Sequence, residues 1–251
     1  MLFFAFMAFA RPRPVVNVDS IARTQRVVLD ISRYQGPDIN FEKVKESCNW
    51  IYVKATEGMN IDPLFRANIA AASSAGIKVG AYCFFSEKSG AREQAKFFIK
   101  TVKSAGVDLG LIPVVDVEKI TTFSPAQLRD SVAVVLNVLQ AEFNCKPMIY
   151  SGARFFLDYL QDFKDYPLWI ARYNDVPPDL GDIDYVLLQW TDSGKVSGID
   201  NSLVDVSSFV GYHHLIKLPS KSQDEDKKAS KSSKKGKKKG KGSRKHKNVS
   251  E

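Results

Sequence analysis

The chain has 251 residues, 44% of them hydrophobic and 11% aromatic, which is enough to bury the core of one large domain. Its formal net charge of +8 would suggest a nucleic-acid-binding protein if the charge were spread over the chain. However, residues 221–251 hold thirteen Lys or Arg against four Asp or Glu, which leaves 23 basic and 24 acidic residues elsewhere. The body is therefore near neutral, and the positive charge that could indicate nucleic-acid binding belongs to the tail.

The two ends of the chain differ in composition from the body. Residues 1–10 are apolar and uncharged, too short to span a membrane, and end in Ala8-Phe-Ala10 before Arg11. This pattern predicts a signal peptide, with an irregular apolar N-terminus as the alternative. We read residues 11–26 as a linker, so that 1–26 precede the domain. The Lys-rich residues 217–251 contain no aromatic side chain after 221, and we expect them to be disordered, without a specific nucleic-acid site.

Eight short segments rich in β-branched and aromatic residues predict strands. The first five alternate with patterns of helical spacing, whereas no helix of useful length separates the last three. Five βα units favour a parallel sheet with crossover helices, and eight strands are enough to close a barrel. We therefore predict an α/β fold, an irregular TIM-like (β/α)5β3 barrel in a single domain over 27–216. The predicted strands are 26–32, 50–56, 77–85, 111–118, 146–151, 167–172, 184–190 and 202–207, and the predicted helices 40–48, 62–74, 90–103, 124–143 and 153–160.

Carboxylates lie at or near the ends of several predicted strands. Active sites of such barrels lie at the C-terminal rim of the strands, so we expect these acids to converge there. Asp116 and Glu118 point to the same face of one strand and form a candidate acid/base pair. In the alternative interpretation, Glu118 caps the following loop and Asp116 is a solvated strand end. The other acids expected at the rim are Asp30, Glu57 and Asp205.

Five motifs in register resemble those of the glycoside hydrolase family 25 muramidases, the Chalaropsis-type lysozymes. They are LDISRYQG (29–36), VKATEG (53–58), PVVDVE (113–118), LWIARY (168–173) and QWT (189–191), the last followed by Gly198-Ile199 and Val204-Asp-Val206. The resemblance covers roughly residues 27–210. It implies a (β/α)5β3 barrel that cleaves the β-1,4 bond between N-acetylmuramic acid and N-acetylglucosamine in bacterial peptidoglycan, as lysozymes of the EC 3.2.1.17 type do.

By motif position, Glu118 resembles the general acid of this family and Asp116 the carboxylate that assists it. Asp30 and Asp205 match two further acids of the family's groove, and neither a metal nor an organic cofactor is implied. Aromatic residues near the rim are candidates for stacking on sugars, with core packing as the alternative. Lys54 is interpreted as an ion-pair partner of a groove acid. The candidate substrate-binding residues are Tyr34, Glu57, Tyr82, Tyr150, Trp169, Tyr173 and Gln189.

Two departures from the family pattern concern details of the groove. Cys83 stands where many relatives have His, and Val206-Ser207 replaces a common Asp-X-Asn. Two alternative functions remain: a catalytically inactive glycan-binding barrel, and a chitinase-like hydrolase. The inactive barrel is disfavoured because all four acids are retained. The chitinase is disfavoured because residues 109–115, just before the Asp116–Glu118 pair, hold no carboxylate.

Other expectations concern metals, partners and location. The three cysteines lack C-x-x-C spacing, which predicts thiols and no zinc site. The histidines lie outside the motifs, so a histidine-based mechanism is not expected. Residues 227–247 could adsorb the protein to anionic wall polymers or other polyanions, or act as a solvated tail. We expect a secreted monomer, with cytoplasmic storage before release as the alternative.

Overall fold

A computed structural model of the chain describes residues 13–22, 26–173, 178–211 and 216–217. The chain divides into two units, residues 1–218 and 219–251, and every described residue belongs to the first. The predicted signal peptide at 1–10 lies outside the described residues. The predicted disordered tail, 217–251, does so as well except for Lys217, which forms a β-bridge with Leu111 and is therefore ordered. Within the described ranges, no helix is both long and apolar enough to cross a membrane.

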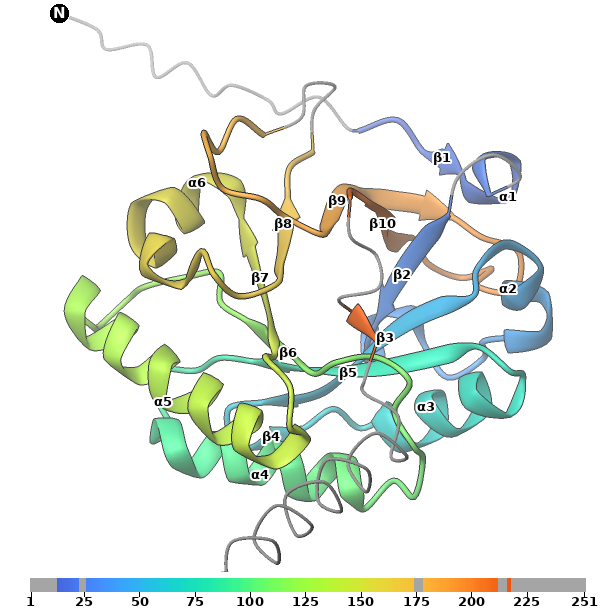
Figure 1. Ribbon diagram of the computed structural model, residues 1–251. Coiled ribbons are helices and arrows are strands. Elements are labelled where there is room, and N and C mark those ends of the chain that lie inside the picture. The colour runs from blue at the N-terminus through green and yellow to red at the C-terminus, as the bar shows by residue number, and fades with distance from the viewer. Residues whose placement is uncertain (1–12, 23–25, 174–177, 212–215, 218–251) are drawn as a thin grey trace, which may run out of the picture. The chain divides into compact units, whose positions relative to one another are not determined.

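Eight strands form a closed barrel (Figure 1). Neighbouring strands are parallel from β2 through β9, while β10 is antiparallel to both β9 and β2 and thereby closes the ring. A two-residue strand, β4 (Asn60–Ile61), forms a hairpin with β3. The barrel strands are β2 (Val27–Ile31), β3 (Trp50–Glu57), β5 (Lys78–Phe84), β6 (Val114–Asp116), β7 (Met148–Gly152), β8 (Leu168–Ala171), β9 (Leu187–Lys195) and β10 (Val204–Phe209).

Five helical connections follow the first five barrel strands, so the predicted (β/α)5β3 order is confirmed. Local capping explains where helices start: Ser124 and Gln127 form a capping box around Pro125, the first residue of α5. The fifth connection is short and passes through a π-helical turn (Phe156–Leu160) and a 3-10 turn (Gln161–Phe163). The helices are α2 (Phe41–Ser47), α3 (Phe65–Ser74), α4 (Ala91–Lys103), α5 (Pro125–Phe143) and α6 (Ala153–Phe155).

Part of the predicted linker is folded, which corrects the expectation for residues 11–26. Residues Val16–Asn17 form strand β1, parallel to β9, and Val18–Ile21 form the short helix α1. Val18 is fully buried, and the Asp19 carboxylate accepts hydrogen bonds from the hydroxyls of Ser47 and Ser197. A two-residue strand and a four-residue helix are too short to show a hydrophobic period, and their stability comes from these tertiary contacts.

The alternation of side chains along the barrel strands places acids above an apolar interior. On β2, Val28 packs inside the barrel and Asp30, two residues later, lies on the same side nearer the C-terminal end. On β6, Val114 and Asp116 repeat this arrangement. A second, larger apolar cluster lies between the barrel and its helices. The interior of the barrel is therefore a packed core whose upper layer carries carboxylates.

Candidate active site

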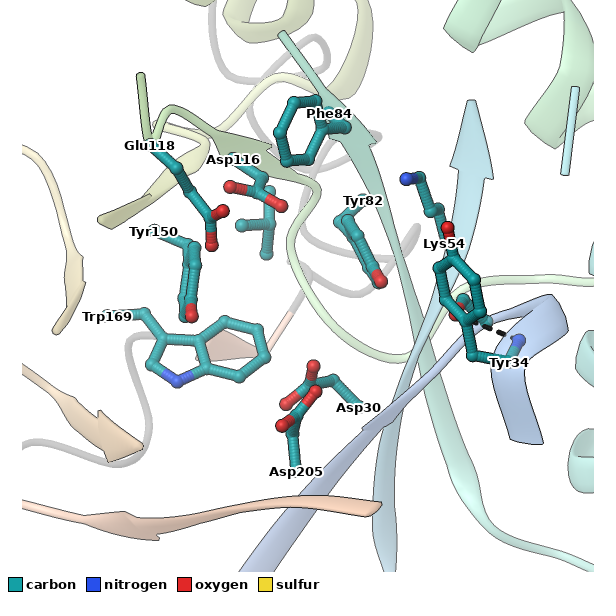
Figure 2. A pocket seen from close by; sticks show the side chains of 12 residues that line it. Asp30, Tyr34, Lys54, Tyr82, Phe84, Asp116, Glu118, Tyr150, Trp169 and Asp205 are labelled. Atoms are coloured by element: carbon teal, nitrogen blue, oxygen red, sulfur yellow. Dashed lines mark hydrogen bonds between the residues drawn. The ribbon is translucent and has the colours of Figure 1, made fainter. Parts of the chain in front are cut away.

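A pocket of about 190 Å³ lies at the C-terminal rim of the barrel (Figure 2). It brings together four of the five acids predicted at the rim and four of the predicted aromatic residues. Glu57, Tyr173 and Gln189 do not line it. The lining residues are Asp30, Ser32, Tyr34, Lys54, Tyr82, Phe84, Val114, Asp116, Glu118, Tyr150, Trp169 and Asp205.

Asp30 and Asp205 form a pair of carboxylates on one side of the pocket. They lie directly opposite each other in the antiparallel register of β2 and β10, and their side chains share a hydrogen bond. Burial and the negative charge of Asp205 raise the pKa of Asp30 well above its ordinary value. Burial and the charge of Asp192 raise the pKa of Asp205 to about 6. Two neighbouring carboxylates cannot both ionise freely, so the pair retains a proton near neutral pH.

Asp116 and Glu118 lie across the pocket from this pair (Figure 2). Asp116 is buried, and its Oδ1 has no hydrogen-bond partner among the described protein residues. Burial and the charge of Glu118 raise the pKa of Asp116 well above its ordinary value. A buried acceptor without a partner is costly, which adds to the free energy needed to ionise Asp116.

Glu118 is exposed as a residue, yet its carboxyl group points into the pocket towards Tyr150. Loss of water around the carboxyl group raises the pKa of Glu118, and a hydrogen bond with Tyr150 and the charge of Lys54 oppose the rise. A carboxyl group that is reachable from solvent and holds its proton to higher pH than usual is suited to act as a general acid.

Gln189 on β9 forms hydrogen bonds with residues on both sides of the site. Its Nε2 donates to Asp30 Oδ2 at 2.9 Å, while its Oε1 accepts from Tyr150 Oη at 2.7 Å and also from the Tyr173 hydroxyl. Only 1% of Gln189 is exposed. Gln189 therefore orients side chains of the site, and neither Gln189 nor Tyr173 lines the pocket. Their predicted contact with substrate stays a prediction.

The aromatic lining residues differ in how much surface they offer to a ligand. Tyr34 is 70% exposed, Tyr82 is half-buried, and Trp169 is 2% exposed. The Trp169 ring packs against Tyr52 and Tyr150, and its Nε1 donates to Ser207 Oγ at 2.9 Å. Most of the Trp169 side chain thus belongs to the core, whereas Tyr34 is free to contact a sugar.

Lys54 separates this pocket from a second, smaller one. Its Nζ forms an ion pair with Glu57 Oε2 at 2.8 Å, in agreement with the predicted role of Lys54 as an ion-pair partner. Glu57 lines the second pocket, of about 170 Å³, together with Arg33 and Asp62. Glu57 therefore lies beside the carboxylate pocket and does not line it.

Sequence reasoning did not single out Phe84 or Glu87. Phe84 lines the pocket, and the ammonium groups of Lys54 and Lys119 each lie 4.8 Å from the centre of its ring. Phe84 follows Tyr82 by two positions on β5, so strand alternation could have identified it. Glu87, which contacts the loop after Glu118, gave no sequence signal because its partners lie 34 to 36 residues away.

The described residues include no group of three or more His, Cys, Asp or Glu side chains arranged to hold a metal ion. An ionised carboxylate and a protonated one on either side of a cleft that also carries aromatic rings are typical of glycoside hydrolases.

Comparisons with known proteins agree with this class. The model of glycosyl hydrolases family 25 matches residues 29–199, and the chain belongs to this family. An Escherichia coli K12 protein called uncharacterized protein YegX is 34% identical over 191 residues, which are 73% of this chain and 69% of YegX. The autolytic lysozyme of Clostridium acetobutylicum is 33% identical over 184 residues, 72% of this chain and 55% of that protein. A family 25 glycosyl hydrolase from Bacillus anthracis superposes with a TM-score of 0.68 at 26% identity, over 82% of this chain and 96% of that one.

Proposed function

We propose that this protein is a lysozyme-type muramidase, which hydrolyses the β-1,4 bond between N-acetylmuramic acid and N-acetylglucosamine in peptidoglycan. The observation that carries the proposal is the rim pocket, in which Glu118 and Asp116 face the Asp30–Asp205 pair. Membership of family 25 and similarity to a protein named autolytic lysozyme support the choice of substrate.

In the proposed reaction Glu118 is the general acid. It donates its proton to the glycosidic oxygen as the bond to the leaving sugar breaks, and it then accepts a proton from the attacking water. Its raised pKa favours this role because the carboxyl group must be protonated at the start of the reaction.

Asp116 assists by acting on the 2-acetamido group of the substrate. Its carboxyl group, which lines the pocket, accepts the N–H of that group and turns the acetamido oxygen towards the anomeric carbon. Attack by this oxygen forms a cyclic intermediate that water opens, with retention of configuration. The charge of Asp205 raises the pKa of Asp30, and the Asp30–Asp205 pair places partial negative charge near the sugar ring, where positive charge develops.

The test compares clearing of a bacterial wall suspension by the wild type, Glu118→Gln and a control, Glu46→Gln. Glu46 is an exposed residue of α2 that does not line the pocket. We expect Glu118→Gln to lose about 10²-fold or more of the activity and Glu46→Gln to keep it. Equal clearing by wild type and Glu118→Gln would remove Glu118 from the acid role. Anomer-resolved NMR of the first product then separates retention from inversion.

The two other functions make different predictions in the same assays. A glycan-binding barrel without activity would bind wall fragments and release no reducing ends. A chitinase-like hydrolase would cleave N-acetylglucosamine oligomers faster than peptidoglycan. We also propose that the protein is secreted and acts as a monomer, which N-terminal sequencing of the mature chain and light scattering would test.

The basic tail is proposed to adsorb the enzyme to anionic wall polymers. Residues 221–251 carry an excess of nine positive charges. A variant truncated after Pro219 should bind walls with less dependence on salt than the full chain, because its charged contacts are fewer. Unchanged salt dependence would show that the tail only solubilises the protein.

A further inference from the structure

Glu87 lies between β5 and α4, outside the pocket, and binds the loop that follows β6. Its carboxylate accepts five hydrogen bonds from three successive residues of this loop. Oε1 accepts from Thr121 N at 2.8 Å, and Oε2 accepts from Thr121 Oγ1 at 2.7 Å, Thr122 N and Thr122 Oγ1 both at 2.6 Å, and Phe123 N at 3.3 Å. One side chain thereby satisfies three consecutive backbone N–H groups that precede α5.

The same loop carries the proposed general acid. On the other side of Glu118, Val117 N donates to Tyr150 O at 2.9 Å, and Ser151 Oγ donates to Val117 O at 2.8 Å. Only residues 118–120 separate this anchor on β7 from the anchor at Glu87. Glu118 therefore lies on a three-residue segment that is fixed at both ends, although it is exposed to solvent.

Lys119 is part of this short segment and brings a positive charge close to Glu118. Its Nζ lies 4.8 Å from the centre of the Phe84 ring, which also lines the pocket. The charge of Lys119 opposes the rise in the pKa of Glu118. Partial burial tends to raise the pKa of Glu87, but hydrogen bonds from Thr122 and Thr121 lower it to about 2. Glu87 is thus ionised, and its contacts intact, over the whole working pH range.

We propose that Glu87 is a positioning residue for the reaction: its carboxylate holds the loop that orients Glu118 and keeps Lys119 beside it. This inference rests on the proposed role of Glu118 as the general acid. Charge-assisted hydrogen bonds to an ionised carboxylate are roughly twice as strong as neutral ones, and five of them act on the same short loop.

The experiment measures kcat and KM against pH on purified bacterial walls for the wild type, Glu87→Ala, Glu87→Asp and Glu46→Ala. Glu46 is the matched control because no hydrogen bond or ion pair is formed by its side chain within the described ranges. Loss of the hydrogen bonds between Glu87 and the loop should lower kcat about tenfold, which corresponds to about 1.4 kcal/mol. KM should change less than about threefold. Glu87→Asp should recover part of the loss.

The pH profile separates a positioning role from a purely structural one. Without the Glu87 hydrogen bonds, Lys119 moves away from Glu118 and the pKa of Glu118 rises. The alkaline limb of the kcat profile then shifts to higher pH. Lys119→Met should cause the same shift, and Glu87→Ala should add no further shift in that background, as a double-mutant cycle would show.

Three outcomes would overturn the inference: kcat of Glu87→Ala equal to that of Glu46→Ala, an alkaline limb that stays in place, or shifts that add fully in the double variant. A lower melting temperature alone would not support it. Failure of the proposed function is distinct, since it would appear as a wild type that releases no reducing ends or as an active Glu118→Gln.

Discussion

Replacing Asp205 by Asn should stabilise the protein at high pH and not at low pH. Folding raises the pKa of Asp205 from the ordinary 3.8 to about 6, through burial and the charge of Asp192. A folded state with a raised carboxyl pKa has its full stability below pH 3.8 and loses it as the pH rises through about 6. This difference in pKa corresponds to about 3 kcal/mol at 1.36 kcal/mol per pH unit.

The expected gain in the free energy of unfolding is smaller than this value of about 3 kcal/mol. Asp205 keeps contact with solvent, and its partner Asp30 can take up a proton in its place. We expect Asp205→Asn to gain about 1–1.5 kcal/mol at pH 8, or roughly 3–5 °C in melting temperature. Thermal unfolding followed by circular dichroism between pH 4 and pH 8 measures the effect, with Asp200→Asn, an exposed acid, as the control. A gain of the same size at pH 4, or a loss at pH 8, would refute this account of the pair.

Three further predictions follow from the same contacts. Gln189→Leu removes the partner of Asp30 and of two tyrosine hydroxyls, so urea unfolding should show a loss of about 2–4 kcal/mol, and a loss under about 1 kcal/mol would contradict the buried network. Tyr34→Ala should raise KM about threefold to tenfold and leave the melting temperature within about 1 °C, because the ring is exposed; an unchanged KM would show that it does not contact sugar. The alkaline limb of kcat/KM should lie above pH 4.5, the ordinary pKa of a glutamate, because the pKa of Glu118 is raised. A limb at or below pH 4.5 would count against the role of Glu118 as the acid.

The order of strands and helices could be predicted because each element is long enough to show its own pattern. The α5 helix, for example, begins at Pro125 after the capping residue Ser124, as the sequence indicates. The segment 13–22 was predicted wrongly because its structure depends on contacts with residues far along the chain. Asp19, for instance, binds Ser197, 178 residues away.

The convergence of the four acids could also be anticipated, since barrel topology brings strand ends to one rim. The sequence could not predict which neighbouring residues line the pocket. Glu57 forms an ion pair with Lys54 and does not line the pocket, and Gln189 is a buried residue that forms three hydrogen bonds. These outcomes depend on side-chain partners from different strands, and a single sequence holds no local pattern for them.

The reversed direction of β10 has a consequence for how the site can vary. Asp205 is the second residue of its strand, so it reaches the rim from a strand that enters the barrel there. A slip of β10 by one residue against β2 would turn Asp205 away from Asp30, while leaving every other acid in place. We therefore expect natural variants to keep the register of β10 more strictly than the length of the helical connections outside residues 118–123.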